Sequence, residues 1–348
     1  MKAALYEGND GYYCRHDRIR WGREGDYRTS PERSSLFAAT FARYFARLHT
    51  ELGQPSSFTI FEAGAGNGQF AEGVLRTLKR SFPNVFEATS YVIAEVSEHA
   101  CALARERLQP FADRVQFRRL EDRNIERGVI FTNELLDALP VHRVTLSDGQ
   151  LREFYVTVRA DGDFDWTLAT PDRAVSTCFE KYFAEAGVHP VEGQIIEVSL
   201  EIENWLRTAA ASLGTGYVVT VDYGAAAEDL YSPDARLQGT LRGFRDHHFV
   251  EDVLAEPGEH DLTTTLNWSF VQSCGSRLGL EILELERQDR FLIANGFLEQ
   301  LEIESSQCRS EAERLRLTSA AREMILPGGM GSHFQVLVQK KTQRNGAL

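Results

Sequence analysis

Short apolar runs alternate with amphipathic segments through the first 140 residues of the chain. The runs typical of buried strands lie at 58–61, 90–95, 115–117 and 128–132. The segments with apolar side chains at helical spacing lie at 35–52, 70–82 and 98–108. Strands separated by helices predict a parallel, doubly wound α/β sheet, and a ligand should bind beyond the carboxyl ends of its strands.

Beyond Pro140 polar and apolar positions alternate, with Ser-Asp-Gly and Ala-Asp-Gly-Asp turns between the segments. The alternating segments lie at 141–146, 151–158 and 164–168, and they predict an antiparallel β insertion. The remaining pattern predicts a helix at 201–213, a strand at 217–222, a helix at 266–278, a strand at 280–285, helices within 290–324 and a strand at 333–339. Seven strands therefore belong to the main sheet.

The element order also predicts how the chain divides. The predicted parts are a cap segment and helix at 1–55, a core at 56–140 and 195–348, and the antiparallel insertion at 141–194. Further insertions in the core lie at 223–262 and 288–326. The segment 223–262 is a functional candidate because it is too long for a plain connector. The large insertions leave from strand carboxyl ends, so they should cover the ligand edge and suit a bulky substrate.

Charge and cysteine content narrow the class of protein. The chain has 51 acidic and 38 basic side chains and a net charge of −13, which argues against nucleic acid as a partner and favours a basic protein or peptide. Its 5 cysteines are far apart and show no C-x-x-C spacing, which indicates a reducing compartment. The first residues lack an apolar signal region and an Arg-rich presequence, and no apolar run is long enough to span a membrane, so we expect a cytoplasmic protein.

The first strand runs directly into an acid and three glycines at alternate positions. Glycine reaches positive φ and has no Cβ, so such a turn lets the backbone approach a ligand. The spacing is G-x-G-x-G rather than the G-x-G-x-x-G of dinucleotide binders, and enzymes that use S-adenosylmethionine commonly place an acid before the turn. The cofactor-binding candidates in this turn are Glu62, Gly64, Ala65, Gly66, Asn67 and Gly68.

Acids also follow the second and third strands. Glu95, followed by Val96, lies where a carboxylate can accept the two ribose hydroxyls of an adenine nucleoside. Glu121 and Asp122 lie just past the third strand, where adenine is usually held. The alternative for each is a solvated surface acid.

A polar cluster follows the fourth strand at 133–140. In one interpretation Asn133 caps a short helix that Pro140 ends. In the other, Asn133, Glu134 and Asp137 surround the nitrogen acceptor of a methyl transfer, as this edge does in class I N-methyltransferases. Asn133 and Glu134 are then also candidates for contact with the cofactor. Glu134 and Asp137, three apart on a helical turn, would then offer two carboxylates to a guanidinium.

The chemistry would be an in-line displacement in which the nitrogen attacks a sulfonium methyl group, so positioning matters most and no metal is required. Carboxylates must orient an arginine guanidinium and take up the proton that it loses. Asp222 and Asp261 are further candidates at the ligand edge. His247 is a weaker one, since in extended backbone adjacent His247 and His248 would point to opposite faces.

Together these residues resemble the MidA-type family of S-adenosylmethionine-dependent methyltransferases, which includes the mitochondrial complex I assembly arginine methyltransferase. The most specific stretches are N-E-x-x-D-A-L-P-V, G-T-L and D-L-T. The matching segments are Gly25–Pro31, Glu62–Gly68, Asn133–Val141, Val221–Gly224, Gly239–Arg245, Pro257–Thr263 and Met330–Gly331.

The resemblance implies a Rossmann-like methyltransferase with a seven-stranded, mostly parallel sheet whose last strand is antiparallel. It also implies that the cofactor contacts the glycine turn and Glu95, and that Thr29, Ser30 and Pro31 reach over it. The family often has Gln where Arg242 stands, and frequently a basic residue where Asn67 stands.

The sequence therefore predicts an N-methyltransferase acting on an arginine of a protein, by resemblance a respiratory complex I-type subunit. One alternative is an assembly factor that keeps the fold and binds without catalysis. Another is a methyltransferase for a small molecule. A dinucleotide dehydrogenase fits least, because the glycine spacing is wrong. The sequence leaves monomer and homodimer both open.

Overall fold

The computed structural model of the chain describes residues 1–16, 20, 25–26, 29–184, 189–232 and 236–342. Two compact units divide the chain. The first, here the insertion unit, comprises Met1–Tyr27, Leu136–Arg207 and Tyr223–Arg277. The second, here the sheet unit, comprises Arg28–Leu135, Thr208–Asp222 and Leu278–Leu348. The N-terminal segment and 223–277 thus group with the β insertion, whereas the sequence-based division treated them separately. Tyr27 and Arg28 of the first family motif lie outside the described residues.

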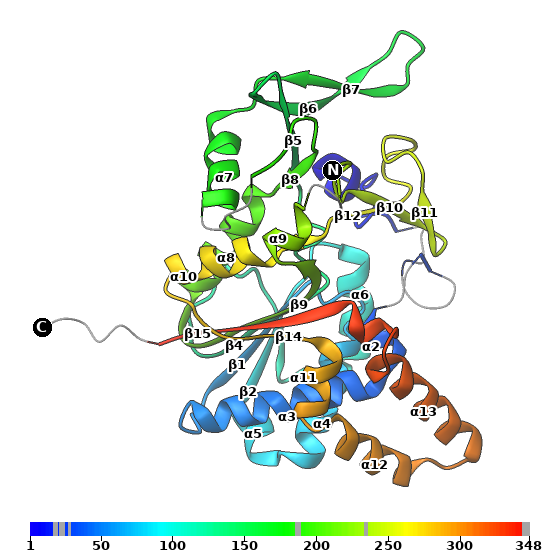
Figure 1. Ribbon diagram of the computed structural model, residues 1–348. Helices are drawn as coiled ribbons and strands as arrows, with labels where there is room; N and C mark the ends of the chain where they lie inside the picture. The colour runs from blue at the N-terminus through cyan, green and yellow to red at the C-terminus, as the bar shows by residue number, and fades with distance from the viewer. Residues whose placement is uncertain (17–19, 21–24, 27–28, 185–188, 233–235, 343–348) are drawn as a thin grey trace, which may run out of the picture. The chain divides into compact units, whose positions relative to one another are not determined.

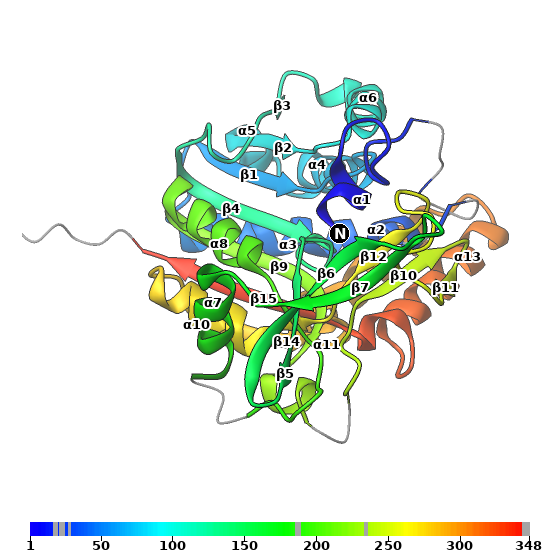
Figure 2. The same cartoon turned by 90° about the horizontal axis from the view of Figure 1, so that it is seen from above.

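The sheet unit contains the predicted parallel sheet. Its strands are β1 (Phe58–Ala63), β2 (Thr89–Ala94), β3 (Val115–Phe117), β4 (Ile125–Asn133), β9 (Leu213–Ala225), β14 (Glu281–Arg287) and β15 (Phe334–Lys341). Their order is β14-β15-β9-β4-β1-β2-β3, and Figure 2 shows β4, β1, β2 and β3 following one another across the sheet. The pairs from β9 to β3 are parallel, and β15 is antiparallel to β14. The sequence prediction of a doubly wound sheet is confirmed.

The predicted helices of this unit begin and end close to their predicted positions, and the short helices Ser30–Arg33 and Pro83–Ala88 were not predicted. The helices are α2 (Ser30–Arg33), α3 (Ser35–Glu51), α4 (Gln69–Ser81), α5 (Pro83–Ala88), α6 (Glu98–Arg107), α11 (Gln288–Ala294), α12 (Phe297–Gln307) and α13 (Glu311–Ile325). Short caps explain several boundaries, since the Ser34 hydroxyl accepts from the Leu36 amide and the Ser97 hydroxyl accepts from the Ala100 amide.

Aromatic side chains hold α3, α4 and α11 on one face of the sheet. Phe70 of α4 stacks on Phe131 of the central strand β4, with ring centroids 4.4 Å apart and an interplanar angle of 9°. Phe41 of α3 lies 5.1 Å from Phe131 and 5.4 Å from Phe291 of α11. All four side chains are buried. Since Phe70 follows Gly68 by two residues, this packing also fixes the start of α4 beside the end of β1.

The insertion unit is built mainly from antiparallel strands. One sheet has the order β7-β6-β5-β8 and another the order β11-β10-β12. The strands are β5 (His142–Ser147), β6 (Gln150–Val158), β7 (Phe164–Ala169), β8 (Ile196–Val198), β10 (Arg242–Arg245), β11 (His248–Val250), β12 (Asp261–Thr263) and β13 (Leu266–Asn267). The helices are α1 (Lys2–Tyr6), α7 (Arg173–Ala184), α9 (Ala227–Leu230) and α10 (Trp268–Arg277), while α8 (Leu200–Ser212) crosses from this unit into the sheet unit.

Two sequence expectations for this unit need correction. The segment 223–262 is not one long loop, because it holds α9 and the three-stranded sheet. The helix predicted at 266–278 begins only at Trp268, because Leu266 and Asn267 pair in parallel with Gly224 and Ala225 of β9. Within the described residues, every helix is too short or too polar to cross a bilayer.

Truncating Phe41 tests the role of the aromatic core. Phe41→Ala should lower the free energy of unfolding by about 3–5 kcal/mol, because it removes a buried ring from several neighbours at once. Arg43→Ala changes an exposed position of the same helix and should cost about 0.5 kcal/mol or less. Chemical denaturation of both variants measures the difference, and equal effects would contradict this account of the core.

Candidate functional site

The glycine turn between β1 and α4 has the backbone geometry that its sequence predicts. Gly66 has φ +52° and Gly68 has φ +77°, both in the left-handed region. A Cβ on Gly68 would lie 3.0 Å from Ala104 Cβ and 3.1 Å from Ala104 Cα, so α6 packs directly against the turn. Any larger residue at Gly68 would therefore push α6 away from α4.

Glu95 is tied to this turn by backbone hydrogen bonds. Its Oε2 accepts from the Gly66 amide at 2.9 Å, and its Oε1 accepts from the Ser97 amide at 2.9 Å. A carboxylate oxygen has two lone pairs and can accept more than one hydrogen bond, so the chemistry of Glu95 suits a ribose hydroxyl. Val96, the next residue, is 67% exposed and adds an apolar surface beside the carboxylate.

Glu62 lies buried at the end of β1. The Tyr91 hydroxyl donates to its Oε2 at 2.7 Å. Burial raises the pKa of Glu62 to about 8, the charge of Glu95 adds to the rise, and the Tyr91 hydrogen bond opposes it. A ligand cation nearby would favour the ionised form of this carboxyl, so the position suits the positively charged end of a cofactor.

The segment Thr29–Pro31 reaches the start of α4. Thr29 caps α2 with Glu32, whose carboxylate accepts from the Thr29 amide at 3.1 Å. The Pro31 carbonyl accepts from Gln69 Nε2 at 3.0 Å, and Gln69 directly follows the last glycine of the turn. The segment implied by the family resemblance therefore lies next to the turn.

β4 ends at Asn133, and Glu134 follows it without forming the predicted helix. The Glu134 amide donates to the Val221 carbonyl at 2.9 Å, which extends the pairing with β9, and Glu134 then takes φ +53°. The prediction that a helical turn places Glu134 and Asp137 on one side is therefore wrong. Asn133 Nδ2 donates to Glu134 Oε1 at 3.0 Å, whereas Asn133 Oδ1 is buried and has no partner among the described residues.

The other predicted residues of the sheet unit lie at the same edge. Glu121 and Asp122 are exposed in the loop after β3, and Asp222 is fully buried in β9. Glu62, Glu95 and Asn133 follow or end β1, β2 and β4, whose parallel pairing brings their carboxyl ends together.

A second polar cluster belongs to the insertion unit and surrounds Asp137. The Asp137 carboxylate accepts from the Tyr223 hydroxyl at 2.5 Å and from the Thr263 hydroxyl at 3.0 Å, and these two hydroxyls also contact each other. The Arg242 guanidinium lies 5.0 Å from the Tyr223 ring centroid. Burial raises the pKa of Asp137, although both hydrogen bonds and the charge of Arg242 oppose the rise.

Asp261 is the second buried carboxyl of this cluster. Its Oδ1 accepts from the Tyr13 hydroxyl at 2.7 Å. Burial raises the pKa of Asp261 to about 7; the charges of Asp137 and Asp26 add to this, and the Tyr13 hydrogen bond opposes it. A carboxyl with such a pKa can exchange a proton near neutral pH.

The backbone at His247 is not extended, although the sequence-based prediction assumed that it was. Asp246 and His247 have φ +50° and +63° and form the turn between β10 and β11. The His247 side chain is exposed, and its amide donates to the Asp26 carbonyl at 3.1 Å. The expectation that adjacent histidines alternate across a strand is wrong, because both turn positions require positive φ.

Sequence reasoning missed the hydroxyl partners of the two aspartates. Tyr13, Tyr223 and Thr263 were not named as site residues. Tyr223 and Thr263 nevertheless lie inside the quoted V-D-Y-G and D-L-T stretches. The signal was therefore present for these two, whereas Tyr13 is distant in sequence and no motif marked it.

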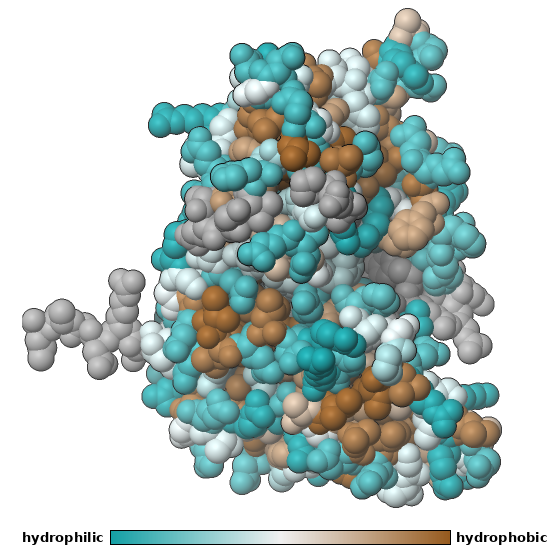
Figure 3. Space-filling model, in the orientation of Figure 1, coloured by the Kyte–Doolittle hydropathy of each residue, from teal (hydrophilic) through white to brown (hydrophobic). Residues whose placement is uncertain are grey.

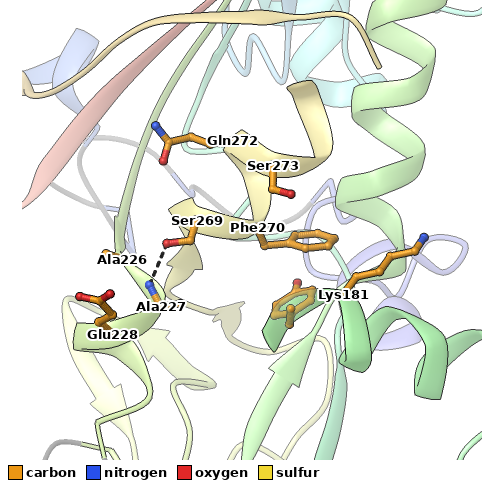
Figure 4. Close-up of a pocket in the computed structure, with 9 residues that line it drawn as sticks. Lys181, Ala226, Ala227, Glu228, Ser269, Phe270, Gln272 and Ser273 are labelled. Atoms are coloured by element: carbon orange, nitrogen blue, oxygen red, sulfur yellow. Dashed lines mark hydrogen bonds between the residues drawn. The ribbon is translucent and has the colours of Figure 1, made fainter. Parts of the chain in front are cut away.

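A pocket of about 340 Å³ also lies in the insertion unit (Figure 4). Its lining includes Phe270 and Tyr182, whose rings stack with centroids 4.0 Å apart. Ser269 lies at its wall and accepts from the Ala227 amide at 3.0 Å. None of the residues predicted for cofactor or acceptor lines this pocket.

The residues at the sheet edge fit an adenosine-bearing cofactor with a charged amino-acid end. Glu95 offers acceptors and Val96 an apolar surface, and the unpartnered Asn133 Oδ1 is a buried acceptor suited to an ammonium or amide donor. A mostly parallel sheet that carries these groups at the carboxyl ends of its strands defines a Rossmann-like methyltransferase that depends on S-adenosylmethionine.

Comparison with known proteins gives the family. The family model described as "putative S-adenosyl-L-methionine-dependent methyltransferase" matches residues 40–285, and the chain belongs to this family. A crystal structure from Burkholderia thailandensis, bound to S-adenosyl-homocysteine, is 29% identical with a TM-score of 0.85, covering 100% of this chain and 87% of that one. The predicted fold, family resemblance and methyl donor are confirmed.

Curated relatives match over almost the whole chain. A protein named protein arginine methyltransferase NDUFAF7 homolog, mitochondrial, from Drosophila melanogaster is 26% identical over 97% of this chain and 79% of its own length. The protein arginine methyltransferase NDUFAF7, mitochondrial, from Homo sapiens is 24% identical over 99% of this chain and 79% of its own length.

Removing the Glu95 carboxylate tests the cofactor assignment. Glu95→Ala should raise the dissociation constant for S-adenosylhomocysteine about tenfold or more, because hydrogen bonds to a charged group contribute roughly 1.5–3 kcal/mol each. Glu98→Ala makes the same charge change at an exposed position of α6 and should bind like the wild type. Calorimetry measures both, with thermal unfolding as the folding check, and unchanged affinity in Glu95→Ala would refute the assignment.

Proposed function

We propose that the chain is a protein arginine N-methyltransferase in which Asp137 and Asp261 receive the guanidinium. The observation that carries this proposal is the pair of buried carboxyls held by tyrosine and threonine hydroxyls in the insertion unit. Carboxylates with fixed hydroxyl donors match the planar donors of a guanidinium better than they match a neutral acceptor. The names of the relatives, protein arginine methyltransferases, point the same way.

The proposed roles follow from what each group can hold. When bound, S-adenosylmethionine supplies a methyl group on a positively charged sulfur. Asp137, fixed by Tyr223 and Thr263, orients the guanidinium, and Asp261 takes the proton that the guanidinium loses. Glu134, just after β4, is also assigned to the guanidinium, and the hydrogen bond that it accepts from Asn133 fixes its carboxylate.

The roles proposed for Asp222 and His247 differ. Asp222 is joined by one peptide bond to Tyr223, so it serves as a buried acceptor next to the residue that binds Asp137. The exposed turn position of His247 supports a contact with a bulky substrate better than a role in proton transfer.

The protein substrate is proposed by resemblance to be a subunit of a respiratory complex I-type assembly. The relatives carry "mitochondrial" in their names, and the cytoplasmic location expected for this chain stays a prediction. An assembly factor without catalysis and a small-molecule methyltransferase are the competing functions.

Transfer of a labelled methyl group separates these functions. Tritiated S-adenosylmethionine and the purified enzyme should label a protein in a lysate from cells that lack the enzyme, with the label on arginine by mass spectrometry. Glu134→Gln should keep S-adenosylhomocysteine binding and reduce labelling roughly 10²-fold or more, as loss of a positioning charge does. Glu126→Gln, at an exposed position near the other end of β4, is the matched control.

Two outcomes would contradict the proposal. Label in a low-mass product alone would favour a small-molecule acceptor. Cofactor binding with no transfer in any fraction would favour an assembly factor. Normal labelling by Glu134→Gln would leave arginine methylation standing and remove Glu134 from the acceptor site.

The pH dependence of turnover tests Asp261 as proton acceptor. The pKa of Asp261 is raised to about 7, so the carboxyl is protonated and inactive well below that pH and ionised above it. We expect turnover to rise about tenfold per pH unit below 7 and to level off above it. Asp261→Asn should be slow and should lose this step, whereas Asp252→Asn, at an exposed position, should keep it. A wild-type profile without a step near 7 would be inconsistent with this role.

A further inference from the structure

The hairpin formed by β6 and β7 is apolar on the side that should face water. Regular antiparallel pairing joins Val158 to Phe164, Val156 to Trp166 and Phe154 to Leu168. Opposed residues in such a pair point to the same side, so these six side chains form one surface, here called the hairpin face. Figure 3 shows mainly hydrophilic residues just below the tip of the hairpin and brown ones lower down.

The hairpin face is exposed over most of its length. Val158 is 62% exposed, Val156 50%, Leu168 46% and Phe164 41%. Arg143 covers only its inner end, with its guanidinium 4.9 Å from the Trp166 ring centroid. Antiparallel sheets normally turn polar side chains to solvent on the side away from their core, and a contiguous apolar surface of this kind indicates a contact surface.

The outer half of the hairpin also lacks support from its own sheet. β5 pairs with β6 only over Gln150–Glu153, so within the described residues Phe154–Val158 has β7 as its one neighbouring strand. An isolated pair of strands is marginally stable in water unless a further strand or layer covers it. The edge strand β7 contains neither Pro nor Lys, the residues that commonly protect a free edge.

The charges at the two ends of the hairpin face are opposite. Arg152, on the same side at the inner end, donates to Thr170 and Gln150, which are both neutral. At the tip, Arg159 pairs with Asp161 and Asp163, which leaves one net negative charge. A copy of the same hairpin laid antiparallel would bring each tip to the other's Arg152.

We propose that the hairpin face packs against the hairpin face of a second copy of this chain about a two-fold axis. A two-fold contact requires a self-complementary surface. The hairpin face has an uncharged centre, a positive inner end and a negative tip, so two copies that run antiparallel bring opposite charges together. Sheets pack face to face through such side chains. The hairpin face has six apolar side chains, fewer than the roughly 20–30 residues per partner of a standard interface, so the dissociation constant should be micromolar.

Sedimentation velocity of the full chain between about 1 and 200 µM tests the proposal. The wild type should pass from monomer to dimer over this range. Phe164→Glu puts a charge on the hairpin face and should raise the dissociation constant at least tenfold. Thr167→Glu makes the same addition on the opposite side of β7, also at an exposed position, and should leave dimer formation unchanged. Circular dichroism of both variants checks that the hairpin sheet is intact.

A charge exchange tests the antiparallel arrangement separately from folding. Arg152→Glu should weaken the dimer, and adding Asp161→Arg and Asp163→Arg to it should restore the dimer, because the exchanged charges would again meet. A wild type that stays monomeric at 200 µM overturns the proposal. So does an equal effect of Phe164→Glu and Thr167→Glu. A monomer whose Phe164→Glu variant instead labels its protein substrate more weakly would assign the face to substrate docking.

Discussion

The stacking of Phe70 on Phe131 is the contact on which the cofactor edge depends. It seats α4 on the central strand β4, and Phe41 and Phe291 extend the same packing to α3 and α11. Because α4 starts at the glycine turn, its position sets where the Gly66 amide points. The Glu95 carboxylate accepts a hydrogen bond from that amide, so the glycine turn itself holds the residue assigned to the ribose.

Both units contain buried carboxyl groups. Glu62 in the sheet unit and Asp137 and Asp261 in the insertion unit are all removed from water, and burial raises the pKa of each. Each also accepts a hydrogen bond from a tyrosine hydroxyl. Acids in such surroundings bind cations strongly, since the cation restores the charge balance that burial disturbs. A sulfonium cofactor and a guanidinium substrate are both cations.

The parallel sheet and its helices could be predicted because apolar periodicity decides them locally, and a glycine turn with an acid before it can be read in one short stretch. The segment 133–140 could not be predicted in the same way. Its sequence permits a capped helix, yet pairing of Glu134 with Val221 draws it into the ladder instead. His247 was misplaced for a related reason, since a turn between β10 and β11 exists only once both strands are paired.

The sequence by itself determined the fold class, the methyl donor and the family, because these depend on local periodicity and on short motifs whose residues act together within a few positions. Only the tertiary structure decided which hydroxyls hold Asp137 and Asp261, since Tyr13 lies 248 positions from Asp261 and Thr263 lies 126 from Asp137. It also decided that the alternation in β6 and β7 leaves an apolar side uncovered. Partners so distant in sequence, and the exposure of a surface, are properties of packing, which no local pattern records.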